Sequence, residues 1–394
     1  MFCIEITVTA KLMIKPTDEQ KTLLLEAGRA FSKACNYVSD FVFYTHNLNQ
    51  ISLQKQTYDT LRGVYNMPSQ MACNVIRHVI GNYRTILTNQ KEWIKPNYDH
   101  IAYPLSWNRD YLLRESYFSV GTLNGRIKLE YANGGMEKYF DGTWTFGLAT
   151  VINKHGKWYL HISMSKEFEQ LNDYDVCNVV GVDLGINFTA TTYDSDGKTT
   201  FFRGTEFGSR IPIKQKRGHY KKIRQQLQKR QTSSARRRLK AIGSRENRWI
   251  SDVNHCISKT LVDSNHKFGK AEFGGTAFIL EDLSGITKFS KAEFIATEKI
   301  RLKDRYVSVS WAFYDLRQKL EYKSKINGDK VIVVDPKYTS QTCPKCGHTE
   351  HTNRDKKKHI FRCKNCGYAS NDDRIGAMNL HRKGIEYLCA VTAE

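Results

Sequence analysis

Two Cys-x-x-Cys pairs near the end of the chain constrain its fold more than any other feature. Cys343 and Cys346 lie in TCPKCG, and Cys363 and Cys366 lie in FRCKNCG, with sixteen residues between the pairs. Each pair can form a tight knuckle, and four thiolates at this spacing surround one tetrahedral zinc ion. Because four thiolates leave no position for water, we expect one structural Zn²⁺ whose binding is coupled to the folding of the segment.

Length and composition place the chain among large globular proteins. Its 394 residues, 40% of them hydrophobic, suffice for two to four domains with a buried core. The first residues lack the pattern of a signal peptide, and no apolar run is long enough to span a membrane. We therefore expect a cytoplasmic protein. The remaining six cysteines follow no spacing frame, which predicts buried reduced thiols at Cys3, Cys35, Cys73, Cys177, Cys256 and Cys389.

The formal net charge of +21 indicates a polyanionic partner. Residues 210–248 hold fifteen Lys and Arg against a single Glu, with Ile223, Leu227 and Leu239 at helical spacing. This pattern predicts two helices, broken near residues 232–234, whose cations contact phosphate. The alternative is a solvated basic surface. The candidate nucleic-acid-binding residues are Lys214, Lys216, Arg217, Lys221, Lys222, Arg224, Lys229, Arg230, Arg236, Arg237 and Arg238.

The first 170 residues read as strands interrupted by helices. Residues 2–14 alternate apolar and polar side chains, which suits a half-buried strand. Thr17 and Gln20 can form a capping box before a periodic helix, and a second amphipathic helix follows Pro68. From 117 to 166 the sequence is strand-like with Gly-rich turns, so a small β-barrel with a helical insertion is predicted.

Three acids lie where a metal-dependent phosphodiesterase would need them. Asp183 ends the apolar run VVGVD, Glu281 ends AFILE, and Asp373 begins an amphipathic helix directly after the second cysteine pair. A run of hairpins that starts from an acid is typical of a ribonuclease-H-like sheet. Three carboxylates are the minimum for two divalent ions about 3.5 to 4 Å apart, and Mg²⁺ or Mn²⁺ fits oxygen ligands. The alternative for each single acid is a turn or a helix cap.

Neighbouring candidates are assigned structural roles. Asp282 faces away from Glu281 on an alternating strand, so it reads as a surface or turn residue. Asp335 ends another strand without a motif, and Asp372 reads as a helix cap. His348 and His359 flank the cysteines, but four thiolates already complete the zinc tetrahedron.

Five motifs together resemble one known family. GVDLGINFTAT, ILEDLSG, YTSQTCPKCGH, FRCKNCGY and NDDRIGAMNL look like those of TnpB, the RNA-guided nuclease of insertion sequences, and of its descendants, the type V CRISPR effectors. The resemblance covers the C-terminal half, with weaker agreement upstream. It implies a RuvC-like catalytic and Mg²⁺-binding trio of Asp183, Glu281 and Asp373. The family usually reads Asp-x-Asn-Ala-Ala at the last acid, whereas this chain has Ile375 and Gly376 in that motif.

The resemblance also implies an activity. A noncoding guide RNA would pair with one strand of double-stranded target DNA beside a short flanking motif, and a single RuvC-like site with two metal ions would hydrolyse both strands. Alternatives are a DDE-like transposase or integrase, whose acids usually run Asp, Asp, Glu, and an RNA-guided DNA-binding regulator without cleavage. The resemblance further implies a nucleoid-associated protein of a prokaryote or phage. The sequence gives neither the oligomeric state nor the flanking motif, and no membrane partner is expected.

The expected fold class is multidomain α+β. Residues 1–15 and 116–175 are predicted to form a β-barrel wedge domain, interrupted by a helical recognition domain at 16–115. A RuvC-like nuclease domain of the ribonuclease H class is predicted at 176–338 and 371–394. The zinc ribbon at 339–370, inserted in that domain, is expected to bind target nucleic acid.

Overall fold

The computed structural model describes most of the chain, in two compact units. The described ranges are 3–90, 92–114, 116–132, 134–154, 156–185, 188–207, 212–265, 274–282, 313–355 and 358–392. The first unit comprises residues 5–167, and the second comprises residues 1–4 and 168–394. Each unit is described by itself below.

The first unit is built on a seven-stranded sheet with the strand order β2-β6-β7-β1-β5-β4-β3. Strand β1 lies in the middle of this order, and its alternating sequence gives it one buried face, because Ile6, Ala10, Leu12 and Ile14 are buried while the odd-numbered residues between them are exposed. Phe2, in the predicted strand 2–14, lies outside the described residues. The strands are β1 (Cys3–Ile14), β2 (Ala102–Leu105), β3 (Tyr111–Leu113), β4 (Tyr117–Thr122), β5 (Gly125–Ala132), β6 (Thr145–Lys154) and β7 (Lys157–Glu169). Closure of this sheet into a barrel stays a prediction.

Three helices occupy the interval between the first two strands of the first unit. They are α1 (Asp18–Thr45), α2 (Gln50–Gly63) and α3 (Ser69–Gln90). The capping box predicted for Thr17 and Gln20 is confirmed, since each side chain accepts from the other residue's backbone N–H. Helices α1 and α3 pack together, and the Tyr83 hydroxyl of α3 donates to the Ser39 carbonyl of α1 at 3.0 Å.

The second unit is built on a five-stranded sheet with the order β10-β9-β8-β11-β12. Strands β8, β9 and β10 form an antiparallel meander, and β8, β11 and β12 run parallel. The bounds are β8 (Val176–Asp183), β9 (Ala190–Tyr193), β10 (Thr199–Phe202), β11 (Gly275–Glu281) and β12 (Lys330–Val334). The carboxyl ends of the parallel strands therefore lie at one edge of the sheet.

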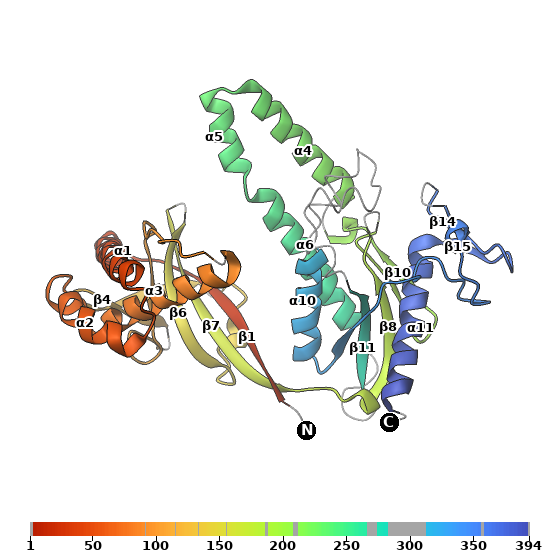
Figure 1. Cartoon of the computed structure of the whole chain (residues 1–394), viewed down its shortest axis with the longest axis horizontal. Helices are drawn as coiled ribbons and strands as arrows, with labels where there is room; N and C mark the ends of the chain where they lie inside the picture. Colours follow the sequence, from red (N-terminus) through yellow and green to blue (C-terminus); the bar gives the residue numbers. More distant parts are fainter. Residues whose placement is uncertain are drawn as a thin grey trace. The chain divides into compact units, whose positions relative to one another are not determined.

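Helices cover both faces of this sheet (Figure 1). On one face, Val180, Val182, Phe278 and Leu280 pack against α6 (Arg245–Asn265) and α10 (Phe313–Ile326). On the other face, the alternate strand residues pack against the terminal helix α11 (Asp372–Thr392). Since both faces are covered, β8 and β11 read as continuous apolar runs rather than as alternating strands.

A small three-stranded sheet precedes α11 directly. Its strands are β13 (Arg354–Asp355), β14 (Ile360–Arg362) and β15 (Ala369–Asn371), in the order β13-β14-β15. The last strand ends at Asn371, and α11 begins at the next residue. The segment with the cysteine pairs is therefore joined to the terminal helix without a loop.

The basic tract forms a helical hairpin, as predicted. Helix α4 (Ile213–Arg230) and helix α5 (Ser233–Ile242) are separated by two residues, and the Thr232 side chain caps α5 by accepting from Ala235 N. Leu227, Ala235 and Ile242 form the seam between these helices. Figure 1 shows α4 and α5 extending beyond the sheet, while α6 returns to it.

The prediction of buried thiols is wrong at three positions. The described cysteines are all free, but Cys3, Cys177 and Cys389 are exposed, and only Cys35 of the six unframed cysteines is buried. Apolar neighbours in sequence do not bury a residue that falls on an outward position of a strand or helix. Within the described ranges, none of the helices combines the length and the apolar character that crossing a membrane requires.

A close approach of α11 to β8 fixes the second unit. A methyl group on Gly181 of β8 would overlap the carbonyl oxygen of Ala377 in α11. We expect Gly181→Ala to lower the free energy of unfolding of this unit by about 2 kcal/mol, because backbone must move to admit the methyl group. Thermal and urea unfolding of the purified chain would measure this loss.

The matched control is Gly218→Ala in α4, where nothing lies within 4 Å of the added atom. Its effect should stay within about 1 kcal/mol and favour the folded state, since alanine is the better helix former. Equal stabilities of the two variants would contradict the close approach.

Candidate metal centre and carboxylate site

Each cysteine pair forms the same kind of turn. Cys343 N donates to His348 O and Cys363 N donates to Tyr368 O, both at 2.9 Å. Gly347 and Gly367 follow the second cysteine of each pair with φ of 72° and 74°, in the left-handed region that glycine adopts without strain. The two knuckles thus come from two copies of the sequence pattern Cys-x-x-Cys-Gly.

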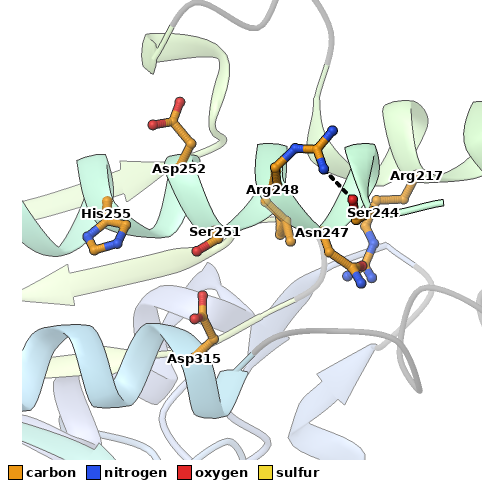
Figure 2. Close-up of a pocket in the computed structure, with 9 residues that line it drawn as sticks. Arg217, Ser244, Asn247, Arg248, Ser251, Asp252, His255 and Asp315 are labelled. Carbon is orange, nitrogen blue, oxygen red and sulfur yellow. Dashed lines mark hydrogen bonds between the residues drawn. The ribbon is translucent and has the colours of Figure 1, made fainter. Parts of the chain in front are cut away.

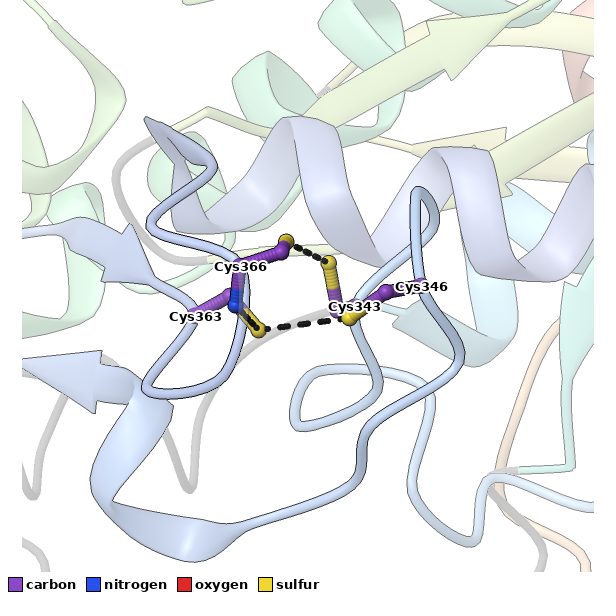
Figure 3. A group of neighbouring side chains, drawn as sticks. All are labelled: Cys343, Cys346, Cys363 and Cys366. Carbon is purple, nitrogen blue, oxygen red and sulfur yellow. Dashed lines mark hydrogen bonds between the residues drawn. The ribbon is translucent and has the colours of Figure 1, made fainter.

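The four sulfur atoms are spaced as ligands of one metal ion (Figure 3). Their Sγ atoms all lie within 4.8 Å of one another, with Cys343 to Cys366 at 3.6 Å and Cys346 to Cys363 at 3.5 Å. Tetrahedral Zn–S bonds of about 2.3 Å place sulfur atoms roughly 3.8 Å apart, whereas a disulfide would need about 2.05 Å. The donor set therefore fits structural Zn²⁺, as the spacing in the sequence predicted.

The thiols differ in their readiness to ionise. Burial raises the pKa of Cys343 to about 12, and backbone hydrogen bonding from His348 lowers the pKa of Cys346 to about 6. A zinc ion removes this difference because it binds thiolates and displaces their protons. The neighbouring histidines have other partners: His348 Nε2 lies 3.1 Å from Glu350, and His359 Nδ1 lies 3.4 Å from Asp372.

The three predicted acids meet at one edge of the five-stranded sheet. Asp183 ends β8 and Glu281 ends β11, and these parallel strands pair with Val182 beside Leu280, so the two acids follow side by side. Asp373 lies in the first turn of α11. A Cβ on Gly376 of that helix would lie 2.9 Å from Asp183 Cγ, so only glycine allows this approach of helix and carboxylate.

Like charge and burial dominate the electrostatics of this carboxylate site. Burial raises the pKa of Asp183 well above its ordinary value, and the charges of Glu281 and Asp373 raise it further. Burial likewise raises the pKa of Glu281, and it raises the pKa of Asp373 to about 6 with help from Asp372. An uncompensated cluster of this kind is stabilised by a cation.

The donor set is compatible with hard divalent ions. Oδ2 of Asp373 is buried and has no hydrogen-bond partner in the described part of the chain, so it is available as a ligand. Among the described residues, the four cysteines are the group of possible ligands whose atoms all lie within 4.8 Å of one another. The carboxylate oxygens of Asp183, Glu281 and Asp373 are spread more widely than this, although the three groups are close enough to influence one another's pKa.

The segment with the cysteine pairs, residues 339–371, is here called the cysteine module, and it contributes further residues to this site. Arg354 Nε lies 2.9 Å from Asp372 Oδ2, and its charge lowers the pKa of Asp183, Glu281 and Asp373. Asp372 is therefore more than the cap that its position suggested, since its buried carboxylate also ties the module to α11. No sequence pattern singles out Arg354, because it lies 18 residues before Asp372 and only the fold brings the two side chains together.

Ile375 has a packing role in this chain. It is fully buried in a cluster with Cys343, Phe361 and Cys363, between α11 and the cysteine knuckles. Where the resembling motif usually has asparagine, this chain therefore has an apolar contact between α11 and the cysteine knuckles, and Asp373 lies in the first turn of the same helix.

The candidate phosphate-binding residues are not equivalent. Arg217 and Glu246 are 2% and 1% exposed and pair at 3.1 Å, and Arg224 joins the same carboxylate at 2.6 Å. Lys216 lies 4.1 Å from the centre of the Trp249 ring. Arg217 thus differs from the expected phosphate contact, since its charge is used inside the fold. The side chain of Lys214 lies outside the described residues.

The other cations of the hairpin remain on the surface. Lys221 is half-buried. The exposed members of the predicted set are Lys222, Lys229, Arg230, Arg236, Arg237 and Arg238. Glu246, the single glutamate of the tract, was the one sequence signal that could have distinguished Arg217 and Arg224 from these exposed cations.

A polar pocket beside α6 is a separate feature. Figure 2 shows Arg217, Arg248, His255 and Asp315 among the residues around this cavity of about 580 Å³. Burial lowers the pKa of His255 to about 4, with help from nearby lysines, so this ring is neutral at pH 7. None of the three carboxylates at the sheet edge lines the pocket.

A known family model matches the cysteine module together with α10 and β12 before it and the first part of α11 after it. Residues 313–380 match the family model described as Cas12f1-like, TNB domain. A CRISPR-associated endodeoxyribonuclease Cas12f1 of Sulfoacidibacillus thermotolerans is 27% identical over 65% of this chain, and a putative RNA-guided DNA endonuclease InsQ of Escherichia coli is 29% identical over 60%. TnpB-like proteins are also among the matches. The chain is similar to TnpB-like and Cas12f proteins.

The alignments with these proteins cover only part of their length. The chain covers 57% of the length of that Cas12f1 and 56% of that InsQ, or a little more than half of each. A solved structure of a Cas12f1–sgRNA–target DNA complex aligns with a TM-score of 0.59 and 14% identity, over 96% of this chain and 99% of that one. At this identity the likeness concerns the fold.

Loss of one exposed zinc ligand should open the cysteine module of this chain. We expect Cys346→Ser to reduce bound zinc from one ion per chain and to loosen residues 339–371, because structural zinc and folding are coupled by on the order of 10 kcal/mol. Metal analysis and hydrogen exchange of the module would measure both effects. Cys389→Ser, at an exposed cysteine of α11 outside the cluster, should keep full zinc content; zinc retained by Cys346→Ser would contradict the four-thiolate site.

Proposed function

We propose that the chain acts as an RNA-guided DNA endonuclease whose cutting site is formed by Asp183, Glu281 and Asp373. The observation that carries this proposal is the meeting of these three acids at the ends of β8 and β11 and the start of α11. Two divalent ions, Mg²⁺ or Mn²⁺, would supply an activated water and stabilise the charge on the departing oxygen. The names of the Cas12f1 and InsQ relatives support the same activity.

The arrangement of the second unit supports a RuvC-like core of the ribonuclease H class. An antiparallel meander leads into the central strand β8, and β11 and β12 add to it in parallel. The first acid lies at the end of the central strand, and the last lies on a helix that covers the sheet. In this proposal the seven-stranded sheet of residues 5–167 is the wedge, its helices are the recognition lobe, and the cysteine module is a zinc ribbon that binds target nucleic acid.

The chain's own residues divide the work. Asp183, Glu281 and Asp373 would hold the ions, and because burial raises the pKa of each carboxyl group, the ions would compete with protons for these oxygens. Arg354 faces the same carboxylates from the cysteine module. The exposed cations of α4 and α5 would hold the phosphate backbone of a nucleic acid, while base pairing between a guide RNA and the target DNA strand would read the sequence.

We expect Asp183→Ala to abolish DNA cleavage while RNA and target binding are retained, because it removes a metal ligand and leaves the cationic surfaces intact. Cleavage of a labelled duplex in the presence of guide RNA, with binding measured in parallel, tests this. Asp196→Ala removes an exposed acid from the β9–β10 turn and should cut at the normal rate. Unchanged cutting by Asp183→Ala would contradict the proposal that Asp183 belongs to the cutting site.

The same assay separates the alternatives. Cleavage that needs RNA favours the guided nuclease, whereas strand transfer of transposon ends without RNA favours a DDE-like transposase or integrase. Binding of RNA and target without any cleavage, by the unaltered chain, favours a regulator.

The cations of α5 should set the salt dependence of nucleic-acid binding. We expect neutralising Arg236, Arg237 and Arg238 to glutamine to weaken binding and to reduce the slope of log K against log salt by about 3, roughly one per phosphate contact. The triple Arg→Lys variant keeps the charge and should keep most of the slope. An unchanged slope in the glutamine variant would show that α5 faces solvent.

A further inference from the structure

A hydrogen bond reaches the Glu281 carboxylate from the start of the cysteine module. The hydroxyl of Thr339, a residue only 3% exposed, donates to Glu281 Oε1. The carbonyl of Pro336, 2.9 Å from the same oxygen of Thr339, is a second acceptor within reach of this single proton. Thr339 is four residues before Cys343, so one short segment links an acid of the sheet edge to a zinc ligand.

The position of this segment is fixed from α11. Asn379, which is 1% exposed, donates from Nδ2 to the carbonyl of Thr339 at 2.7 Å and to that of Thr342 at 2.8 Å. Two bonds from one planar amide hold both ends of the 339–342 turn against the helix. That helix also carries Asp373, so the turn is held by the element that supplies another of the acids.

The other end of the turn is held by the cysteine knuckle. Thr342 shares a hydrogen bond of 2.9 Å with Thr349, and the next residue, Cys343, donates its N–H to His348. Ile375 of α11 packs on Cys343 from the other side. The turn therefore lies between two structures that the sequence separates, the knuckle and the terminal helix.

We propose that Thr339 is a positioning residue that orients Glu281 as a metal ligand, and that Asn379 sets the place of Thr339. This inference rests on the proposed function, in which Glu281 holds a divalent ion. A hydroxyl bond to one carboxylate oxygen fixes the side-chain orientation and leaves the other oxygen for the ion. The bond also opposes the rise in the pKa of Glu281 that burial causes, and so favours the ionised form.

The bonds from Asn379 to the 339–342 turn and from Thr339 to Glu281 form a relay. This relay gives a reason for the cysteine module to adjoin the carboxylates. Outer groups that hold a ligand in place are worth about 10- to 100-fold in metal affinity. Here the outer group belongs to a turn that ends on a zinc knuckle, so the order of the zinc module is transmitted to one ligand of a second metal site.

The test is Mn²⁺ binding to the full chain by calorimetry, without nucleic acid, together with zinc content. We expect Thr339→Val, which keeps shape and loses the donor, to weaken Mn²⁺ binding about tenfold or more with zinc retained. Thr339→Ser, which keeps the hydroxyl, should restore most of the affinity. Thr352→Val makes the same substitution at an exposed residue of the module whose hydroxyl contacts Glu350, and it should bind Mn²⁺ normally.

A double variant tests the relay itself. Asn379→Ala should weaken Mn²⁺ binding in the same direction, and its combination with Thr339→Val should lose less than the sum of the two, because both act through one turn. Additive losses would show that Asn379 acts elsewhere, against the relay.

Outcomes for the two proposals are distinct. Normal Mn²⁺ affinity in Thr339→Val, or loss of zinc from that variant, would overturn the positioning role while the nuclease proposal stands. Failure of the unaltered chain to bind Mn²⁺ at millimolar concentration, with no change on Asp183→Ala, would overturn the proposed carboxylate site and the relay with it.

Discussion

The second unit depends on how closely the terminal helix α11 lies on the central strand β8. Gly181 and Gly376 remove the side chains that would hold helix and strand apart, and Leu380 and Leu388 then bury the contact. Dispersion and burial along this seam set the place of every group further up the helix. The chemistry at the sheet edge is thus a result of packing several turns away.

A buried group of like charges works against that packing. Asp183, Glu281 and Asp373 each have a raised pKa, so folding brings together carboxyl groups that would be more stable apart in water. Arg354 offsets part of this repulsion without removing it. The fold holds the acids in place through the seam, the Thr339 bond and the Asp372–Arg354 pair, which suits a site that is completed by cations.

Local patterns in the sequence predicted the local structure well. The capping box at Thr17, the break between α4 and α5, and the gathering of the four cysteines depend on residues a few positions apart, or on a recurrent spacing. The approach of the three acids was predicted from strand ends and a family resemblance. In contrast, Thr339 and Arg354 reach the site through contacts between distant segments, which no periodicity encodes. The inward turn of Arg217 depends on helix phase relative to Glu246, so charge counting alone treated it like its neighbours.

The buried pair of Arg217 and Glu246 has a mechanical consequence for the basic hairpin. These residues anchor the root of α4 to α6, with Arg224 as a second tie about two turns further along. Beyond Arg224, α4 and α5 contact mainly each other within the described part of the chain. The eighteen residues of α4 correspond to a helix about 27 Å long. The exposed cations beyond Arg224 thus lie on the part of this helical pair that is distal to α6. A force applied to them is transmitted through Arg217, Arg224 and Glu246 to α6, a helix that covers one face of the five-stranded sheet.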